Sequence, residues 1–437
     1  MGMTQLTRTL TTARALADAT PADRKRSIDF LRAASILVVV IGHWIMASPE
    51  IVDGRVQIGR LLADAPWTQW LTWILQVMPV FFFVGGYANA VAWRSAHGRG
   101  VAYAVWLRSR LRRLILPAVP VLLFWVPVAA VALASGLEPS LIKVATQAAL
   151  VPTWFLATYV LIVMTAPWTL ATWDRFRWWA FAAFAFLAGT VDVLALGFGF
   201  HDVIWLNYLF VWNAVHMLGY AWADGAIGGI VARLSTAIGG LVALASLVFF
   251  GPYPIAMVGL DNVAVTNSNP PKVTLVALGI FQFGLAMIFE SRLESWLTRR
   301  RPWTAVIAVN GSIMSLYLWH LTVMVAVLAV SLGLGGIGLG LDPDSPLWWF
   351  TRPIWVGFLA ILTLPVVAVV ARFERPQRDR RPAPPVWKPV VAVLALCAGL
   401  GLLAKNGLVD SDGFNLTAVA LTSVGILAGG LVGSNET

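Results

Sequence analysis

One apolar stretch of the sequence, residues 28–48, contains three ionisable residues, which are costly to bury in lipid and are therefore candidates for function. Asp29 and Arg32 are three positions apart, so a helix places them on one face, where they can pair. Eleven positions separate Arg32 from His43, which at about 100° per residue is three turns plus about 20°, so these two side chains point the same way. Over that distance a helix rises about 16.5 Å, which places His43 near the centre of a bilayer or just beyond it.

This spacing suits a reaction between a phosphorylated cosubstrate and a hydroxyl group. A neutral imidazole can take a proton from a hydroxyl at neutral pH, and cations at the mouth of a helix can hold phosphate groups. We therefore expect phosphates near Arg32 and a reactive group at His43. The alternative for a single buried imidazole is a hydrogen-bonded packing residue, and the spacing alone leaves that alternative open.

A second set of arginines follows in the segment WLRSRLRRLILP. Arg110 and Arg113 are three positions apart and so share one face of a helix at the membrane surface. Two guanidiniums on one face can clamp phosphate through paired hydrogen bonds, which lysines cannot do. The general enrichment of basic residues on the cytoplasmic side explains positive charge here, but it does not explain why every basic residue of the segment is arginine.

Two further ionisable residues lie at nearly the same depth as His43. Counted from the cytoplasmic ends of their predicted helices, His43, Asp192 and His320 lie about 21 to 24 Å into the membrane, so they can share a cavity. Asp192 can orient an imidazole or stabilise its charge, but it can equally cap a neighbouring helix. His216 lies one turn after Asn213, which favours hydrogen bonding between helices over catalysis. We expect no metal site, and the single cysteine, Cys397, excludes a disulfide within the chain and a CxxC metal site.

These residues must be positioned by transmembrane helices. Of the 437 residues, 59% are hydrophobic and 12% charged, a composition far from that of soluble domains. The fold class that we expect is all-α, a polytopic bundle of transmembrane helices. Twelve apolar stretches are long enough to cross a membrane; they span residues 28–48, 70–93, 112–135, 153–170, 178–197, 203–223, 229–250, 273–290, 304–333, 347–372, 387–404 and 414–433.

The basic residues predict how this bundle is oriented. Twenty-five lysines and arginines fall on one side of the twelve spans and six on the other, so both termini should be cytoplasmic and the protein should be integral to the plasma membrane. The net charge of +10 then reflects topology and contact with anionic lipids, and we expect no nucleic-acid partner.

Several of these segments resemble the acyltransferase 3 family of integral membrane acyltransferases. The pattern IDFLRA with the spacing from Arg32 to His43 is similar to the family's opening, and MPVFFFVGGYANA is similar to its Phe-rich, Gly-Gly segment. Arg110 and Arg113 fit its RxxR motif, and TWFLATYVL and SLYLWH resemble two later segments. The likeness runs from about residue 26 to residue 372.

The resemblance implies a ten-helix core that transfers an acyl group, often acetyl, from cytoplasmic acyl-CoA. The acceptor would be a hydroxyl of a carbohydrate, a glycolipid or a small natural product, with acyl-CoA as a cosubstrate and no bound cofactor. His43 matches the catalytic histidine of the family, and Arg32, Arg110 and Arg113 match its CoA-binding positions. Asp29 and His320 match the pattern without an assigned role, and together with Asp192 they are possible supporting residues.

The expected domain organisation follows from the resemblance and the spans. It has a cytoplasmic tail over residues 1–27, a ten-helix core over 28–372, a cytoplasmic linker over 373–386 and two accessory helices over 387–433. A twelve-helix secondary transporter is the main alternative function, because twelve spans with both termini inside is a common transporter architecture. However, the halves 28–223 and 229–433 show no convincing similarity to each other.

Overall fold

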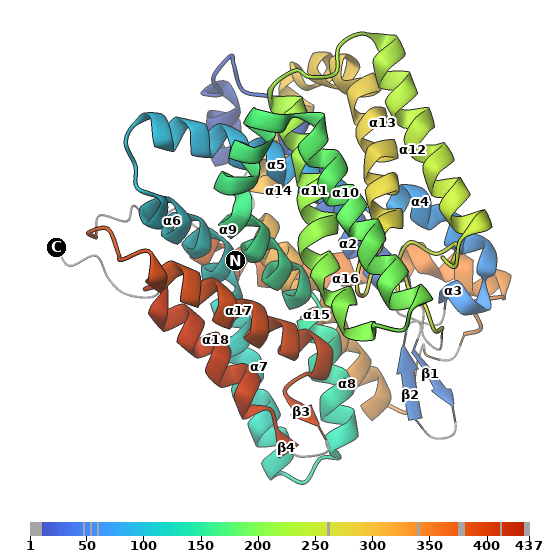
Figure 1. Ribbon diagram of the computed structural model, residues 1–437. Coiled ribbons are helices and arrows are strands. Elements are labelled where there is room, and N and C mark those ends of the chain that lie inside the picture. Colours follow the sequence, from blue (N-terminus) through green and yellow to red (C-terminus); the bar gives the residue numbers. More distant parts are fainter. Residues whose placement is uncertain are drawn as a thin grey trace.

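The computed structural model describes residues 11–46, 49–52, 55–58, 61–259, 263–337, 339, 341–374, 381–410 and 413–431, and these form a bundle of helices with two small hairpins (Figure 1). The first half contains α2 (Arg26–Met46), α3 (Leu61–Asp64), α4 (Thr72–Leu75), α5 (Met78–Gly98), α6 (Tyr103–Ile115), α7 (Val119–Ala134), α8 (Pro139–Leu150), α9 (Thr153–Phe176), α10 (Trp178–Asp192) and α11 (Asn207–Ala223). The second half contains α12 (Ile230–Phe250), α13 (Val273–Leu297), α14 (Arg300–Asn310), α15 (Ile313–Gly333), α16 (Pro346–Val370), α17 (Trp387–Asn406) and α18 (Leu416–Ala428).

The strands form only short antiparallel hairpins. Strand β1 (Pro49–Val52) pairs with β2 (Arg55–Ile58), and β3 (Val409–Asp410) pairs with β4 (Gly413–Phe414). Both hairpins lie at the lower end of the bundle in Figure 1. The all-α fold class is therefore confirmed.

Ten helical segments among the described residues are long and apolar enough to cross a membrane. Each corresponds to one of the twelve predicted spans. The other two predicted spans correspond to shorter helices, α11 with 17 residues and α18 with 13. Large apolar side chains on the outside are strongly exposed, among them Phe186 (74%), Phe250 (90%) and Phe350 (76%), as expected for helices that face lipid. The chain is a multi-pass membrane protein.

The predicted span 304–333 is in fact two helices. Helix α14 ends at Asn310, and α15 begins at Ile313 after Gly311 and Ser312. Asn, Gly and Ser have low helix propensity, and the Asn310 side chain donates to the carbonyl oxygens of Val306 and Asp29. The break brings Asn310 against α2, where it contributes to the site described below.

Two other elements differ from the prediction. The span 112–135 begins inside the amphipathic helix α6 and continues into α7 through a short 3-10 turn that contains Pro117, whose ring cannot continue an α-helix. Helix α8 was not predicted, because its sequence PSLIKVATQAAL is too short and too polar for a span.

Close helix contacts in the bundle depend on glycine. At the crossing of α5 and α11, a Cβ on Gly86 would collide with the carbonyl oxygen of His216, and a Cβ on Gly219 would collide with that of Phe83. Small residues allow this approach of two backbones in a membrane. The crossing brings Asn89 of α5 next to His216 of α11.

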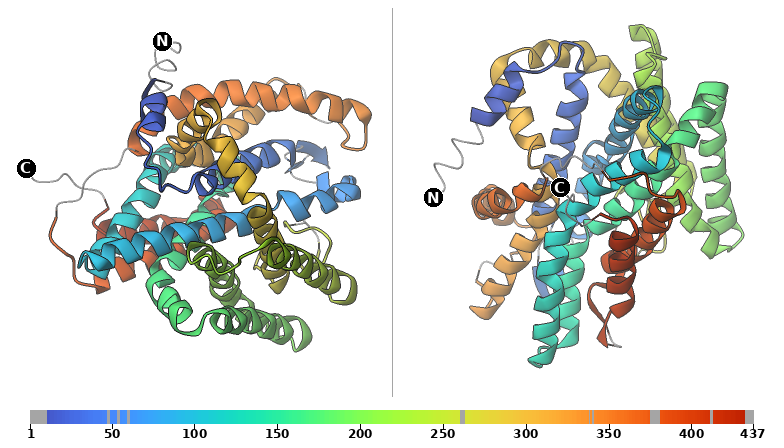
Figure 2. Two further views of the ribbon diagram at one scale, coloured as in Figure 1. Left: turned by 90° about the horizontal axis from the view of Figure 1, so that it is seen from above. Right: turned by 90° about the vertical axis from the view of Figure 1, so that its left-hand side faces the viewer.

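Helix α2 is surrounded by other helices: it packs against α5, α13, α14, α15 and α16. Its side chains Asp29, Arg32 and His43 each contact other polar groups of the protein. The two C-terminal helices, red in Figures 1 and 2, lie side by side, and α17 also packs along α9. Thr153 of α9 donates to the Leu400 carbonyl oxygen at 3.0 Å, and the Cys397 thiol donates to that of Ala157 at 3.0 Å.

Candidate active site

The pair predicted between Asp29 and Arg32 is present at one end of α2. Arg32 Nη2 lies 3.0 Å from Asp29 Oδ1, and the other carboxylate oxygen lies 2.7 Å from Nε of Arg24. Arg32 Nε donates to Asn310 Oδ1 at 2.8 Å, while the Asn310 amide donates to the Asp29 carbonyl oxygen at 2.9 Å. These contacts fix the direction of the Arg32 guanidinium.

The structure brings the three predicted arginines together around one tyrosine. The Tyr159 hydroxyl of α9 lies within electrostatic range of Arg32, Arg110 and Arg113, and Arg32 is close enough to Arg113 for the two cations to repel each other. The Tyr159 side chain also forms a hydrogen bond with Asn89. Segments that are far apart in the sequence thus meet in one cationic cluster, which we define as Arg32, Arg110, Arg113 and Tyr159.

Positive charge in this cluster exceeds the negative charge beside it. No described residue forms an ion pair with Arg110 or Arg113; the Arg110 guanidinium lies 5.6 Å from the centre of the Trp106 ring. Arg113 is exposed, and Arg110 is partly exposed. Guanidiniums without carboxylate partners are well suited to bind an anion with several phosphate groups.

Glu374 lies beside the cationic cluster and interacts electrostatically with Arg113. Its carboxylate accepts hydrogen bonds from the backbone N–H groups of Met314, at 3.2 Å, and Ser315, and so caps the first turn of α15. Burial raises the pKa of Glu374 above its ordinary value, although these hydrogen bonds and Arg113 act in the opposite direction.

Deeper along α2, two histidines form a direct pair. His43 Nδ1 lies 2.9 Å from Nε2 of His320, and the planes of the two rings differ by 7°. His320 Nδ1 lies 2.7 Å from the carbonyl oxygen of Tyr317. His320 is completely buried, whereas His43 keeps part of its surface accessible. The structure thus brings together two of the three residues that the sequence places at one depth.

Asp192 is not part of this pair. Its carboxylate accepts hydrogen bonds from the Asn207 side chain at 2.7 Å, the Tyr253 hydroxyl at 3.0 Å and the backbone N–H of Val273 at 2.9 Å. It therefore holds the end of α10 to the start of α13. Of the two roles considered for Asp192, the structure shows the capping of a neighbouring helix. Its similar depth does not bring it to His43, because depth does not fix the direction in which a side chain points.

His216 makes contacts between helices, as expected. Its Nε2 lies 3.2 Å from the Asn89 amide nitrogen, and its Nδ1 lies 2.9 Å from the Tyr220 hydroxyl. It is completely buried. Asn89 links it to Tyr159, so a polar chain leads from the cationic cluster into the bundle.

Sequence reasoning missed Tyr159, Asn310 and Glu374. Tyr159 and Asn310 are uncharged, so a search for ionisable groups within apolar stretches does not find them. Tyr159 does lie in TWFLATYVL, one of the segments that carry the family resemblance, and this was the available signal. Glu374 lies just past the end of a predicted span, so a search for ionisable groups within the spans does not find it.

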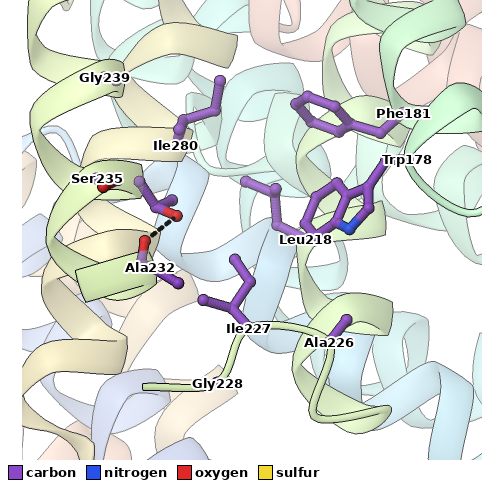
Figure 3. A pocket seen from close by; sticks show the side chains of 12 residues that line it. Trp178, Phe181, Leu218, Ala226, Ile227, Gly228, Ala232, Ser235, Gly239 and Ile280 are labelled. Carbon is purple, nitrogen blue, oxygen red and sulfur yellow. Dashed lines mark hydrogen bonds between the residues drawn. The ribbon is translucent and has the colours of Figure 1, made fainter. Parts of the chain in front are cut away.

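A crevice of about 590 Å³ lies elsewhere, between α10, α11, α12 and α13 (Figure 3). Trp178, Phe181, Leu218 and Ile280 line it together with small residues of α12, and no ionisable side chain is among its lining residues. None of the candidate site residues lines it. Among the described residues, no group of three or more histidine, cysteine, aspartate or glutamate side chains is arranged to hold a metal ion.

The comparison with protein families identifies the family of the chain. The model of the acyltransferase 3 family, described as an acyltransferase domain, matches residues 25–372, which contain the cationic cluster and the histidine pair. None of the curated proteins and none of the solved structures compared with the chain matches it. Because the match extends over most of the chain, the protein belongs to the acyltransferase 3 family and is a membrane acyltransferase.

Proposed function

We propose that this acyltransferase takes its acyl group, acetyl or another short chain, from acyl-CoA and transfers it to a hydroxyl of a carbohydrate, a glycolipid or a small natural product. One observation carries the proposal: a cluster of arginines and a histidine pair are joined by a single helix, α2, which contributes Arg32 to the first and His43 to the second. A cationic mouth and a deeper imidazole match the two ends of an acyl-CoA molecule.

The cationic cluster is the proposed site for the phosphates of CoA. CoA has a diphosphate and a separate phosphate, and planar guanidiniums bind phosphate oxygens through two parallel hydrogen bonds. Arg110 and Arg113 come from α6, and Arg32 comes from α2. The site thus forms between two elements, and the electrostatic repulsion between Arg32 and Arg113 would be relieved by a bound polyanion.

His43 is the proposed general base. It takes the proton of the acceptor hydroxyl while the hydroxyl oxygen attacks the thioester carbonyl carbon. A carbon–oxygen bond forms, the carbon–sulfur bond breaks, and the CoA sulfur leaves as a thiolate. The imidazolium then returns the proton to that thiolate, so the products are the acyl ester and free CoA. His43 is suited to this role because the residue is only partly buried although it lies between helices.

The sidedness of the reaction is part of the proposal. The arginines of the cluster belong to the predicted cytoplasmic side, where most of the basic residues fall, so acyl-CoA would enter from the cytoplasm with both termini on that side. The predicted location is the plasma membrane, with anionic lipids contacting the basic residues at its surface.

The test is acyl transfer by the purified protein in detergent, where no sealed compartment exists. Given acetyl-CoA and an extract of lipids, glycans or metabolites, the protein should release free CoA and add an acetyl mass to one component, as measured by thiol titration and mass spectrometry. Comparison of metabolites and glycans from a strain with and without the gene would then identify the acceptor by its missing acyl mass. If neither acyl transfer nor slow hydrolysis of acetyl-CoA, propionyl-CoA or butyryl-CoA occurs, acyl-CoA is not the donor.

A further inference from the structure

The hydrogen-bond partners of His320 determine where its proton lies. Its Nδ1 is 2.7 Å from the carbonyl oxygen of Tyr317, and a carbonyl oxygen can only accept. Nδ1 must therefore carry the hydrogen. Water cannot substitute for this partner, because the side chain of His320 is completely buried.

The position of that proton decides the state of the next nitrogen. A neutral imidazole has one N–H group, and a second proton would place a cation in a site where no carboxylate of the described residues contacts either ring. Nε2 of His320 therefore carries a lone pair and no hydrogen, and it accepts a hydrogen bond from Nδ1–H of His43 across the 2.9 Å contact. Consequently the lone pair of His43 is on Nε2, on the edge of the ring that faces away from His320.

The geometry of the contact supports a well-formed hydrogen bond. The ring planes differ by only 7°, and the ring centres are 5.2 Å apart, as expected for two imidazoles joined in line through one nitrogen of each. An in-line, coplanar arrangement directs the N–H of one ring at the lone pair of the other.

Neighbouring contacts hold both rings in place. The indole of Trp44, the residue after His43, donates to the His320 carbonyl oxygen at 3.2 Å, and the Trp44 carbonyl oxygen accepts from Trp355 of α16 at 2.9 Å. The Tyr317 hydroxyl donates to the carbonyl oxygen of Pro152 at 3.1 Å, which ties α15 to the start of α9. The pair thus belongs to a junction of four helices.

We infer that His320 is a positioning residue: through the hydrogen bond between its Nε2 and Nδ1–H of His43, it holds His43 in the tautomer whose Nε2 is free to accept the hydroxyl proton. This inference rests on the proposed function. When His43 becomes an imidazolium, its Nδ1–H remains bonded to the His320 lone pair, which stabilises the new charge without a second proton transfer. The chain from the Tyr317 carbonyl through His320 to His43 has the logic of a catalytic triad in which a histidine and a backbone carbonyl replace the carboxylate.

Two substitutions at one position test the inference. In His320→Gln, the amide oxygen can occupy the place of Nε2 and accept from His43, whereas His320→Leu fills similar space without an acceptor. We expect His320→Leu to lower kcat by about 100-fold or more with little change in KM for acetyl-CoA, since loss of the correct tautomer costs up to about 10⁴ in a serine protease. His320→Gln should recover at least about a tenth of the parental kcat, because its amide oxygen can still accept from Nδ1–H of His43 and so keep the same tautomer.

A spectroscopic measurement separates this inference from the proposed function. With ¹⁵N-labelled histidine, the parent should show His43 with a protonated Nδ1 and an unprotonated Nε2, assigned by comparison with His43→Gln. His320→Leu should show a mixture of tautomers at His43. A parent spectrum with the proton on Nε2, or kcat within two-fold of the parent in His320→Leu, would overturn the inference. Absence of acyl transfer by the parent would instead overturn the proposed function, and the tautomer at His43 would still be read from the spectrum.

Discussion

His43 is the residue on which the proposed chemistry depends most directly. His43→Ala should lower turnover by about 10² to 10⁴, the usual contribution of a general base, because the acceptor hydroxyl then has no group to take its proton. Binding of acyl-CoA should be nearly unchanged, since the cationic cluster is separate from the histidine pair. The measurements are acyl transfer and a melting curve for each variant.

The matched control for this substitution is His216→Ala. Its histidine is also buried in the bundle and hydrogen-bonded between helices, but it contacts Asn89 and Tyr220 and not His43. We expect this variant to melt at a lower temperature while keeping most of its activity per folded molecule. Near-parental turnover in a well-folded His43→Ala protein would rule out the general-base role.

If the cationic cluster binds the phosphates of CoA, removing its arginines should weaken the binding of acyl-CoA. Changing both Arg110 and Arg113 to alanine removes two charge-assisted contacts, each worth about 1.5 to 3 kcal/mol, so acyl-CoA should bind at least about 100-fold more weakly. Isothermal titration with a non-hydrolysable acyl-CoA analogue measures this directly. Arg99→Ala is the control, because the described side-chain partner of Arg99 is the nearby Ser95 hydroxyl. Arg108 is less suitable, because it is buried and donates to the carbonyl oxygens of Arg381 and Pro382. Equal affinity of the double variant and the parent would remove the donor site.

At the scale of single residues, the sequence predicts contacts within one helix better than contacts between helices. The pair of Asp29 and Arg32 follows from a spacing of three, which a helix converts directly into proximity. Arg32 meets Arg113, and His43 meets His320, only because segments distant in the sequence pack together. For such contacts the sequence indicates only the depth of each residue in the membrane and the family resemblance. Depth alone suggested Asp192 as a neighbour of the histidines, although the carboxylate instead contacts Asn207, Tyr253 and Val273.

An ion network joins helices α5, α9 and α11 at one end of the bundle. Asp224 accepts hydrogen bonds from Arg94 at 2.6 Å, from the Trp173 indole at 2.9 Å and from Arg177. Burial alone would raise the pKa of Asp224, but the hydrogen bonds, that from Arg94 foremost, lower it below the ordinary value of 3.8. The carboxylate is therefore favoured in the folded state, and this helps to hold the three helices together.

The lowered pKa of Asp224 determines how its contribution to folding stability depends on pH. A carboxyl whose folded-state pKa is depressed stabilises the protein above its ordinary pKa, and the contribution disappears as the pH falls below about 3.8 towards the folded-state pKa. Asp224→Asn should thus lower the melting temperature by about 2–4 °C or more at pH 7 and by much less near pH 3. Melting curves of the parent and the variant from pH 3 to 8 test this, with the exposed Asp202→Asn as the control. A difference that does not vary with pH would contradict it.

The sequence predicts the helices that are recognised by the length of an apolar stretch. It does not predict the helix break and the short helix that depend on particular side-chain contacts. Long apolar stretches such as α13 and α16 are unambiguous in sequence, because only a helix satisfies its own backbone in lipid. The break between α14 and α15 depends on Asn310, whose side chain bonds to α2, and this contact is not visible in a hydropathy profile. Helix α8 is short and forms by packing against α7, α15 and α17.

The orientation of the bundle in the membrane decides from which side acyl-CoA can reach the cationic cluster. The proposed orientation rests on the distribution of basic residues, 25 against six, and it predicts that the turn between α7 and α8 faces outward while the end of α13 faces the cytoplasm. Single cysteines at exposed positions of these two regions, Ser140 and Thr298, distinguish the two sides. The single cysteine of the sequence, Cys397, is first replaced by alanine so that its thiol cannot react with the label. This thiol contacts the Ala157 carbonyl oxygen within the bundle.

A membrane-impermeant maleimide applied to intact cells or spheroplasts should label Ser140→Cys but not Thr298→Cys, and both should be labelled once the membrane is permeabilised. Because Arg32, Arg110 and Arg113 are assigned to the same side as Thr298, this pattern would place the phosphate site where cytoplasmic acyl-CoA is available. The reverse pattern, with Thr298→Cys labelled from outside, would put the cationic cluster on a side that lacks acyl-CoA. In that case the arginines could still bind an anion, but a donor other than cytoplasmic acyl-CoA would have to supply the acyl group that His43 helps to transfer.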